Sequence, residues 1–141
     1  MKLLKLFSAT SLFGATLLAT VAQAAPPTNV SGLVGTWYNT NASTRGIVKI
    51  IVTNTRSGLR FQSFGSCSPT PCVHSVVAAY PHSASVSSNT AVGFTAFRNS
   101  GFKYARFSSE RVGAYLRMSQ FSTFASGDTR KNYTTTEYFK R

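Results

Sequence analysis

From residue 33 onward the sequence is a succession of short runs rich in Val, Ile, Thr, Phe and Tyr, separated by clusters of Gly, Asn, Asp and Ser. Such runs are typical of β-strands, and the clusters supply the positive-φ positions that tight turns need. The pattern predicts strands at about Leu33–Asn39, Ile47–Thr53, Leu59–Gly65, Ser75–Tyr80, Ala91–Arg98, Phe102–Ser109, Ala114–Phe124 and Tyr133–Phe139. No stretch here has the sustained 3.6-residue apolar period of an amphipathic helix. The chain is therefore expected to be all-β.

Eight strands joined by short connections predict an antiparallel meander. At this size, closure into an up-and-down barrel is the natural way to remove both sheet edges. A two-sheet β-sandwich is the alternative, and the regular hairpin spacing favours the barrel. A barrel of eight strands is wide enough to be filled by its own side chains or to hold one small ligand.

The N-terminal part has a different character. Residues 1–24 contain two early lysines, an apolar stretch and the small residues Ala22 and Ala24, which is the pattern of a secretory signal peptide cleaved after Ala24. An uncleaved anchor is the alternative, but the apolar stretch is short and interrupted by polar residues. We expect a flexible leader at 25–31, a single barrel domain at 32–141, and a secreted or periplasmic location.

Two cysteines, Cys67 and Cys72, enclose a short segment that contains two prolines. In an exported protein such a pair is expected to form a disulfide. A metal site would need four ligands, and only His74 lies nearby, so no metal is expected. The predicted role of the disulfide is to hold a loop in place.

The charge balance limits the chemistry. The chain has 15 Lys and Arg but only 3 Asp and Glu, so a site built from several carboxylates is excluded. His74 and His82 flank one predicted strand and would lie at its opposite ends, which does not form an acid–base pair. We expect a protein that is not an enzyme and has no cofactor. A small ribonuclease-like site is the enzymatic alternative, because the positive charge would suit RNA.

The basic residues are dispersed, with no run longer than two, and several alternate with aromatic residues, as between Phe102 and Phe107. On a strand, this alternation places Lys103 and Ala105 on one face and Tyr104 and Arg106 on the other. Such a face could stack bases or sugars, so an anionic glycan, nucleic acid or protein surface is a candidate partner. The alternative is an ordinary barrel wall with cations pointing outward.

The segment Gly35-Thr36-Trp37-Tyr38-Asn39, followed by Ser43, resembles the first strand and loop of the avidin–streptavidin family. Residues 90–99 are similar to that family's fifth strand and turn, and Gln120-Phe121 and Glu137-Tyr138-Phe139 to its last two strands. The resemblance implies an eight-stranded barrel that binds a small ligand at its mouth. Members of the family usually associate, so it also implies a homo-oligomer, which the positive charge opposes unless the interface is uncharged.

The resemblance also implies roles for individual residues. Asn39 and Ser43 match the residues that bind the ureido oxygen of biotin, and Glu137 stands where an Asp accepts a ureido N–H. Phe97 and Phe121 stand where Trp residues wall the pocket, and Ser108 where a hydroxyl meets the ligand. Trp37 matches a structural Trp that packs the closed end of the barrel. Because it is the only Trp in the chain, a small ligand other than biotin is expected.

The chain also resembles a set of small exported bacterial proteins of unsettled function. The shared marks are Thr44-Arg45-Gly46-Ile47, the cysteine segment from Phe64 to Cys72, and Asn132-Tyr133 followed by Glu137-x-Phe139-x-Arg141. Streptavidin lacks the cysteine loop, so this likeness implies a separate branch with a different ligand.

Overall fold

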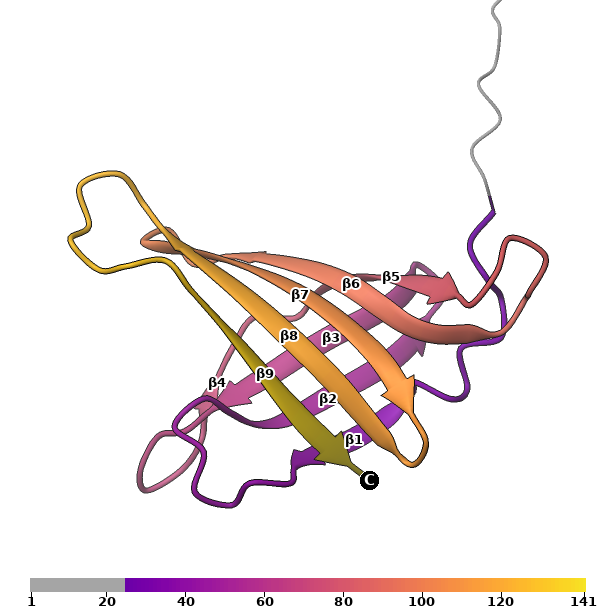
Figure 1. Ribbon diagram of the computed structural model, residues 1–141, viewed down its shortest axis with the longest axis horizontal. Helices are drawn as coiled ribbons and strands as arrows, with labels where there is room; N and C mark the ends of the chain where they lie inside the picture. The colour runs from indigo at the N-terminus through magenta and orange to yellow at the C-terminus, as the bar shows by residue number, and fades with distance from the viewer. Residues whose placement is uncertain (1–24) are drawn as a thin grey trace, which may run out of the picture.

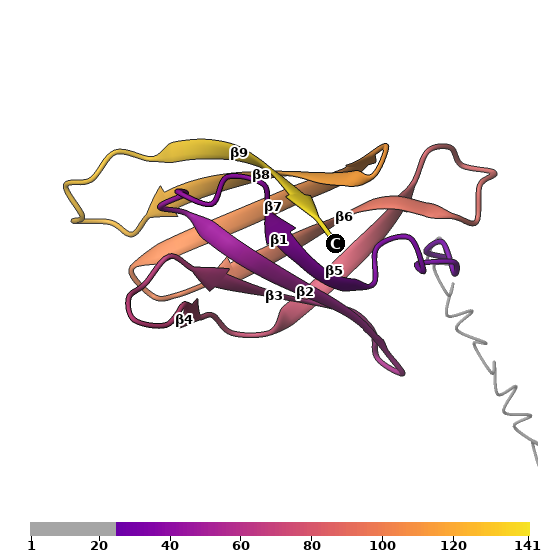
Figure 2. The same ribbon diagram turned by 90° about the horizontal axis from the view of Figure 1, so that it is seen from below.

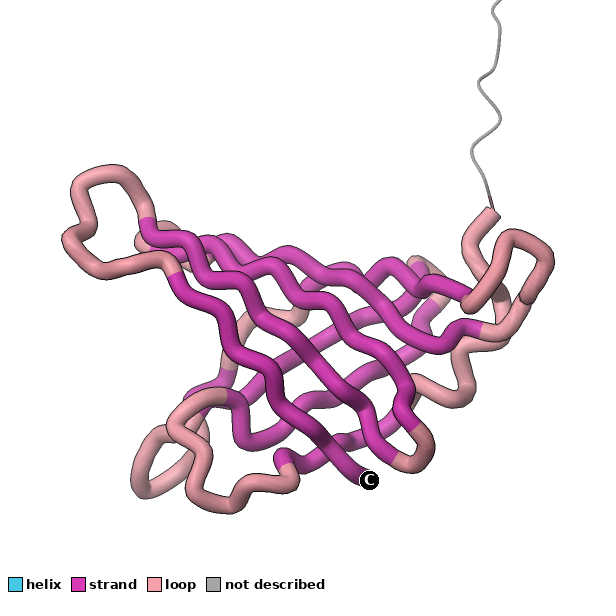
Figure 3. The backbone as a smooth tube through the Cα atoms, in the orientation of Figure 1, coloured by secondary structure: helices cyan, strands magenta, loops and turns pink. Residues whose placement is uncertain are grey.

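A computed structural model describes residues 25–141. The predicted signal peptide, residues 1–24, lies outside the described residues. The described part contains nine strands and no helix (Figure 3). The strands are β1 (Gly35–Asn39), β2 (Ile47–Thr55), β3 (Gly58–Gly65), β4 (Cys72–Val73), β5 (Val77–Ser83), β6 (Ala91–Asn99), β7 (Lys103–Val112), β8 (Tyr115–Phe124) and β9 (Tyr133–Lys140).

Eight of the strands form a closed antiparallel up-and-down barrel. The sheet order is β2-β1-β9-β8-β7-β6-β5-β3-β4, and the pairing of β2 with β3 closes it. In Figure 1, β1–β3 cross behind β7–β9, and the perpendicular view of Figure 2 shows β9 and β3 on opposite sides of the barrel. The two-residue strand β4 is an addition beside β3. The predicted barrel is confirmed, and the continuous pairing around the sheet excludes the sandwich.

All eight predicted strands are present, with shifted boundaries. The β7–β8 hairpin is tighter than expected, because Gly113 adopts a φ of 58° and lets the chain reverse between Val112 and Tyr115. The predicted strand at 75–80 begins later and continues to Ser83. Residues with weak strand propensity at its end are held there by pairing with β6.

Part of the expected leader contacts the barrel. The backbone of Asn29 bonds to Asn89 O (3.0 Å) and to Ala91 N (2.8 Å). Val30 is buried in the core. Residues 29 and 30 are therefore packed against the barrel domain.

Alternation of side chains along each strand fills the interior with apolar groups. Phe61, Phe94 and Phe107 lie in contact at the middle, with the Phe61 ring 5.4 Å and 4.9 Å from the other two ring centroids. Ile50, Leu116 and Phe139 are also fully buried in the interior. The middle of the barrel is therefore solid.

One end of the barrel is closed by Trp37, which is fully buried and donates its indole N–H to Leu33 O at 2.9 Å. The guanidinium groups of Arg111 and Arg141 lie 5.2 Å and 4.4 Å from its ring. Both arginines also donate to the carbonyl of Gly32. A ligand can therefore approach the interior only from the opposite end.

Candidate functional site

The opposite end of the barrel contains a hollow, here called the mouth pocket, with a volume of about 240 Å³. Its walls come from strand ends that an up-and-down barrel brings to the same rim, together with the loops between them. The lining residues are Arg45, Gly46, Ile47, Gly65, Ser66, Cys67, Cys72, His74, Arg98, Lys103, Gln120 and Tyr133. Most of these side chains are polar or cationic, in contrast to the apolar layer beneath.

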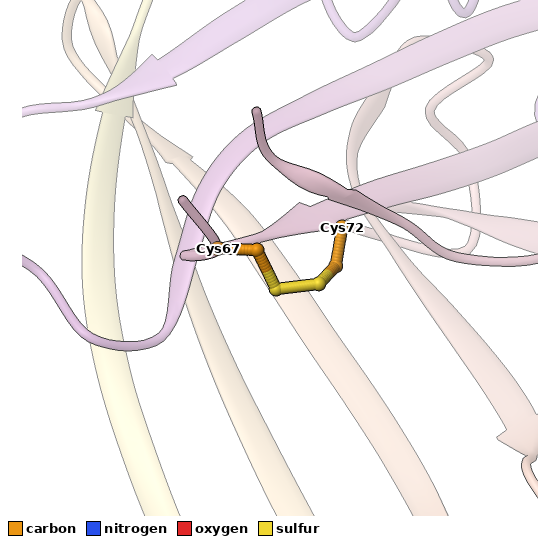
Figure 4. The surroundings of a disulfide bond; sticks show 2 residues. All are labelled: Cys67 and Cys72. Carbon is orange, nitrogen blue, oxygen red and sulfur yellow. A yellow bond between two sulfur atoms is a disulfide. The ribbon is translucent and has the colours of Figure 1, made fainter. Parts of the chain in front are cut away.

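The cysteine loop forms one wall of the mouth pocket. Cys67 and Cys72 form the predicted disulfide, with their Cα atoms 5.3 Å apart (Figure 4). The disulfide joins the segment after β3 to β4, which itself pairs with β3. The loop is therefore tied to the barrel on both sides, and the wall it forms is held in place.

Arg98 lies at the inner end of the pocket and is only 5% exposed. Its Nη1 donates to the hydroxyl of Ser63 at 2.5 Å, and its guanidinium carbon lies 5.2 Å from the centre of the Phe107 ring. Its Nε is buried and has no hydrogen-bond partner within residues 25–141. Burial lowers the pKa of Arg98, which shows how poorly its charge is solvated.

His74 reaches Arg98 through Ser63. Its Nδ1 lies 2.8 Å from the Ser63 hydroxyl, which is fully buried. Burial of the ring and then the positive charges of Arg98 and Lys103 lower the pKa of His74, although a hydrogen bond with the backbone of Ser63 acts in the opposite direction. His74 is therefore neutral at pH 7 and acts in the wall as a hydrogen-bonding group.

This lowered pKa makes the stability of the fold pH-dependent. In the unfolded chain His74 titrates near 6.5, so below that pH the unfolded state binds a proton before the folded state does. The free energy of unfolding should therefore keep its full value above about pH 6.5 and fall as the pH drops below it. Denaturant titrations between about pH 8 and about pH 5 measure this loss.

The loss should be smaller in His74→Gln, which has no imidazole to protonate. Asp128 does not interfere, since its hydrogen bonds to Arg130 lower the pKa of that carboxyl to about 2, below this window. Identical pH profiles for the wild type and His74→Gln would contradict the prediction.

The other wall carries Lys103, Gln120 and Tyr133. Gln120 is buried and donates to the buried Ser122 hydroxyl at 2.8 Å, while Lys103 Nζ lies 3.5 Å from the Tyr133 hydroxyl. A hydrogen bond from Ser122, followed by the charges of Lys103 and Arg130, lowers the pKa of Tyr133. The wall thus offers several hydrogen-bond donors in a positively charged setting.

No carboxylate lines the mouth pocket. In the described part of the chain, Glu110 pairs with Arg117, Asp128 pairs with Arg130, and Glu137 accepts hydrogen bonds at the 40–46 loop. The cations Arg45, Arg98 and Lys103 therefore face the pocket without a counter-ion from residues 25–141.

The structure brings together two of the predicted ligand-binding residues, Asn39 and Glu137. Asn39 Nδ2 donates to Glu137 Oε1 and to Ile47 O, both at 2.8 Å, while Asn39 Oδ1 accepts from Asn41 N at 2.8 Å. Thr44, rather than Ser43, donates its hydroxyl to Glu137 at 2.5 Å. These bonds engage both polar ends of Asn39 and hold the loop after β1.

Ser43 is exposed in that loop, and only its backbone N–H is bonded, to Asn41 Oδ1. It does not join Asn39 and Glu137, because the loop presents Thr44 at the carboxylate.

The Glu137 bonds predict a difference between two substitutions. Glu137→Ala should lower the free energy of unfolding by about 1–2 kcal/mol, because Thr44 loses its acceptor and Asn39 loses one of two. Glu137→Gln keeps one oxygen that can accept both bonds, so its effect should stay below about 0.5 kcal/mol. Urea denaturation of both variants tests this. An equal loss in both would mean that the charge of Glu137, rather than its acceptor oxygen, is what stabilises the loop.

The other three predicted residues, Phe97, Ser108 and Phe121, lie on the outer face of the barrel. Phe97 and Phe121 are 45% and 50% exposed, and Ser108 is also exposed. Their neighbours Ala96, Phe107 and Gln120 point inward, and a strand reverses its face at every residue. The expected single site at the mouth is therefore not formed by all six residues.

The residues that sequence reasoning missed are Ser63, Arg98, Lys103, Gln120 and Tyr133. The signal for Arg98 was available, because it lies two and four residues after Ala96 and Phe94 and so shares their inward face. An arginine in the inward register of a barrel strand is costly to bury and indicates a function. The sequence does not indicate an inward position for Lys103 or Tyr133, since each is the first residue of a strand and follows a loop.

Comparisons with family models, curated protein sequences and solved structures gave no match. The part of the chain from residue 25 onward contains no helix that is long and apolar enough to cross a membrane. Within the same residues, no three His, Cys, Asp or Glu side chains are grouped so that they could hold a metal ion.

Proposed function

We propose that this protein is an exported, non-enzymatic barrel that binds one small ligand in its mouth pocket. The observation that carries the proposal is a polar hollow of about 240 Å³ above a filled apolar interior. Small-ligand sites combine a concave shape with a few fixed polar groups, and barrel mouths are a common place for them. Rigid strands and a disulfide hold these groups in place, which favours binding without a large ordering cost.

The non-enzymatic part of the proposal is supported by how the acid–base groups are used. The carboxylates of Glu110 and Asp128 pair with arginines, and Glu137, which lies behind the rim, accepts hydrogen bonds from Asn39 and Thr44. His82 bonds to Thr95 on the exposed side of β6 and is remote in register from His74. Among residues 25–141, the mouth pocket is lined by one histidine, His74, and by no carboxylate. The pair of histidines, or the histidine and carboxylate, that a ribonuclease-like mechanism would use is therefore not assembled there.

Export is supported by the disulfide together with the pattern of residues 1–24. Disulfides persist in oxidising compartments such as the periplasm and the extracellular space. This agrees with a basic start, an apolar stretch and a small-residue cleavage site at the N-terminus.

The avidin-like residues support the pocket indirectly. Gly46 lines the mouth pocket, and the Glu137 oxygens lie 3.1 Å and 3.2 Å from where a Cβ on Gly46 would be. Asn39 and Glu137 thus hold the loop that forms the rim. Since Asn39 is engaged and Ser43 points elsewhere, a ligand other than biotin is the better fit.

Mass spectrometry of small molecules that co-purify with the folded protein tests the proposal. A compound found this way should raise the melting temperature, since a ligand at about 100 times its Kd adds about 2.7 kcal/mol. Gln120→Phe, which fills the pocket, should abolish the rise. If nothing co-purifies and neither biotin nor a small-molecule panel shifts the transition, the proposal fails.

A second candidate function is favoured by a group of exposed side chains on β5–β8, here called the outer aromatic patch and defined by Tyr80, Phe97, Arg106 and Phe121. These residues border a shallow hollow on the outer face. The Arg106 guanidinium lies 5.6 Å from the Phe97 ring, and Tyr80 is 62% exposed. Aromatic faces beside a cation suit the bases or sugars of an anionic polymer.

Binding of this second kind would weaken steeply as salt increases, because it releases counter-ions. Fluorescence anisotropy with a single-stranded oligonucleotide and with a sulfated glycan separates the two polymers. Loss of affinity in Phe97→Ser and Arg106→Gln would support the outer aromatic patch. Equal affinity in both variants and the wild type would exclude it.

A further inference from the structure

The buried guanidinium of Arg98 is the least satisfied charge in the mouth pocket. It is 5% exposed, and its Nε has no partner within residues 25–141. No salt bridge of the described residues involves it. Taking an ion out of water is costly unless another charge or hydrogen bonds compensate, and among residues 25–141 the Ser63 hydroxyl is the one acceptor bonded to it. A bound anion would supply the missing compensation.

The surroundings of Arg98 independently indicate an anion. Arg45 and Lys103 line the same pocket, and no carboxylate does. The Tyr133 hydroxyl and the buried Gln120 amide add neutral donors at the same rim. The positive field also acts on the walls, since it helps to lower the pKa values of His74 and Tyr133.

The orientation of Arg98 is set before any ligand arrives. Ser63 holds Nη1, and Ser63 in turn is held by His74 at 2.8 Å. The Phe107 ring lies 5.2 Å from the guanidinium carbon and packs against the group. A planar guanidinium fixed in this way can offer its remaining N–H groups to an oxyanion without first losing side-chain freedom.

We propose that the mouth pocket selects ligands that carry a small oxyanionic group, a carboxylate or a phosphate, and that Arg98 anchors this group through the guanidinium N–H groups that Ser63 does not engage. Lys103 and Arg45 add charge at the rim. The inference rests on the proposed binding of a small ligand in this pocket and names the chemistry of that ligand. The volume of about 240 Å³ lies below the usual range for drug-sized ligands, so the pocket suits a compact anion or the anionic head of a longer molecule.

Calorimetric titrations of the disulfide-intact protein test this inference. The probes are inorganic phosphate, acetate and citrate, with glycerol as the neutral probe, all at one ionic strength so that general screening stays constant. We expect phosphate or a carboxylate to bind and glycerol not to. Arg98→Gln should weaken anion binding at least about tenfold, the scale of one lost charge-assisted hydrogen bond. Arg56→Gln is the matched control, because it removes an equal charge from the exposed β2–β3 turn and should bind as the wild type does.

A second measurement keeps the inference testable if Arg98→Gln does not fold. In the wild type, the Nε–H resonance of Arg98 should shift with saturating dependence on phosphate or acetate, while that of Arg56 should not. The proposed role of Arg98 would be overturned if its Nε–H resonance did not shift with any anion. It would also be overturned if Arg98→Gln bound anions as tightly as the wild type.

The same experiments distinguish failure of the anion inference from failure of the proposed binding of a small ligand. If a neutral compound co-purifies, binds in the pocket and binds equally well to Arg98→Gln, small-ligand binding stands and the anion inference fails. If no compound of either kind binds, both fail.

Discussion

Replacement of Arg98 by methionine should make the folded protein more stable while removing its anion site. Methionine has a similar length and no charge, so it can fill the same space against Phe107 without a buried ion. Ser63 keeps a partner in His74, so no new unsatisfied group is left. Replacement of a buried ion pair by apolar side chains of similar volume is often neutral or stabilising by about 1–4 kcal/mol. A single buried charge without a counter-ion should gain on the same scale, and we expect about 2 kcal/mol here.

Urea denaturation in a buffer without phosphate or carboxylates measures this gain as a higher midpoint at an unchanged slope. Arg56→Met serves as the control, since an exposed turn residue should change the free energy of unfolding by less than about 0.5 kcal/mol. Phosphate or acetate should stabilise the wild type and leave Arg98→Met unchanged. A variant less stable than the wild type in the absence of anions would show that the charge is well compensated within the fold, and the argument for an anion would lose its basis.

Replacement of Trp37 by alanine should cause the largest loss of stability among the substitutions considered. The indole is fully buried, and it carries the contacts of Arg111, Arg141 and Leu33 at the closed end. Removal of a buried Trp side chain costs about 3–5 kcal/mol. Since small domains are stable by only about 5–15 kcal/mol, Trp37→Ala should be largely or wholly unfolded in mild denaturant.

Trp37→Phe separates packing from hydrogen bonding. The phenyl ring retains most of the buried area but cannot donate to Leu33 O, so a loss of about 1–2 kcal/mol is expected. Circular dichroism during denaturation should rank the wild type above Trp37→Phe and Trp37→Phe above Trp37→Ala. Anion binding at the mouth should survive in Trp37→Phe, because the two ends are separated by the apolar layer of Phe61, Phe94 and Phe107. A Trp37→Ala loss below about 1 kcal/mol would mean that the closed end is not held together by this residue.

The candidate site differs in part from the site that the family resemblance implies. The resemblance of the first and last strands to the avidin–streptavidin family singled out Asn39 and Glu137, which are neighbours across 98 residues. It did not show that they bind each other. A residue's partner depends on what the loop beside it presents, and here Thr44 reaches the carboxylate while Ser43 does not. The aromatic residues Phe97 and Phe121 were assigned to the pocket by resemblance, yet one residue of register decides which face of the wall they occupy.

The class and the connectivity of the fold follow from local features of the sequence. Alternating β-branched and aromatic runs, turn residues between them, and the need to leave no open sheet edge led to the eight-stranded barrel. These are local signals, carried within about ten residues of chain, and they were sufficient because an up-and-down barrel pairs consecutive strands. The cysteine spacing likewise predicted the disulfide that the structure contains.

Which end of the barrel is open, and which groups meet there, depends on how the strands are arranged in three dimensions. Arg98, Lys103 and Tyr133 come from three different strands, and their common rim depends on the stagger of the strands around the closed barrel. The same stagger places Trp37 and two arginines at the other end. Charge and polarity are properties of single residues, whereas a site is a property of their separation in space. That separation depends on the pairing register of every strand in the closed sheet. No short stretch of sequence specifies all of these registers.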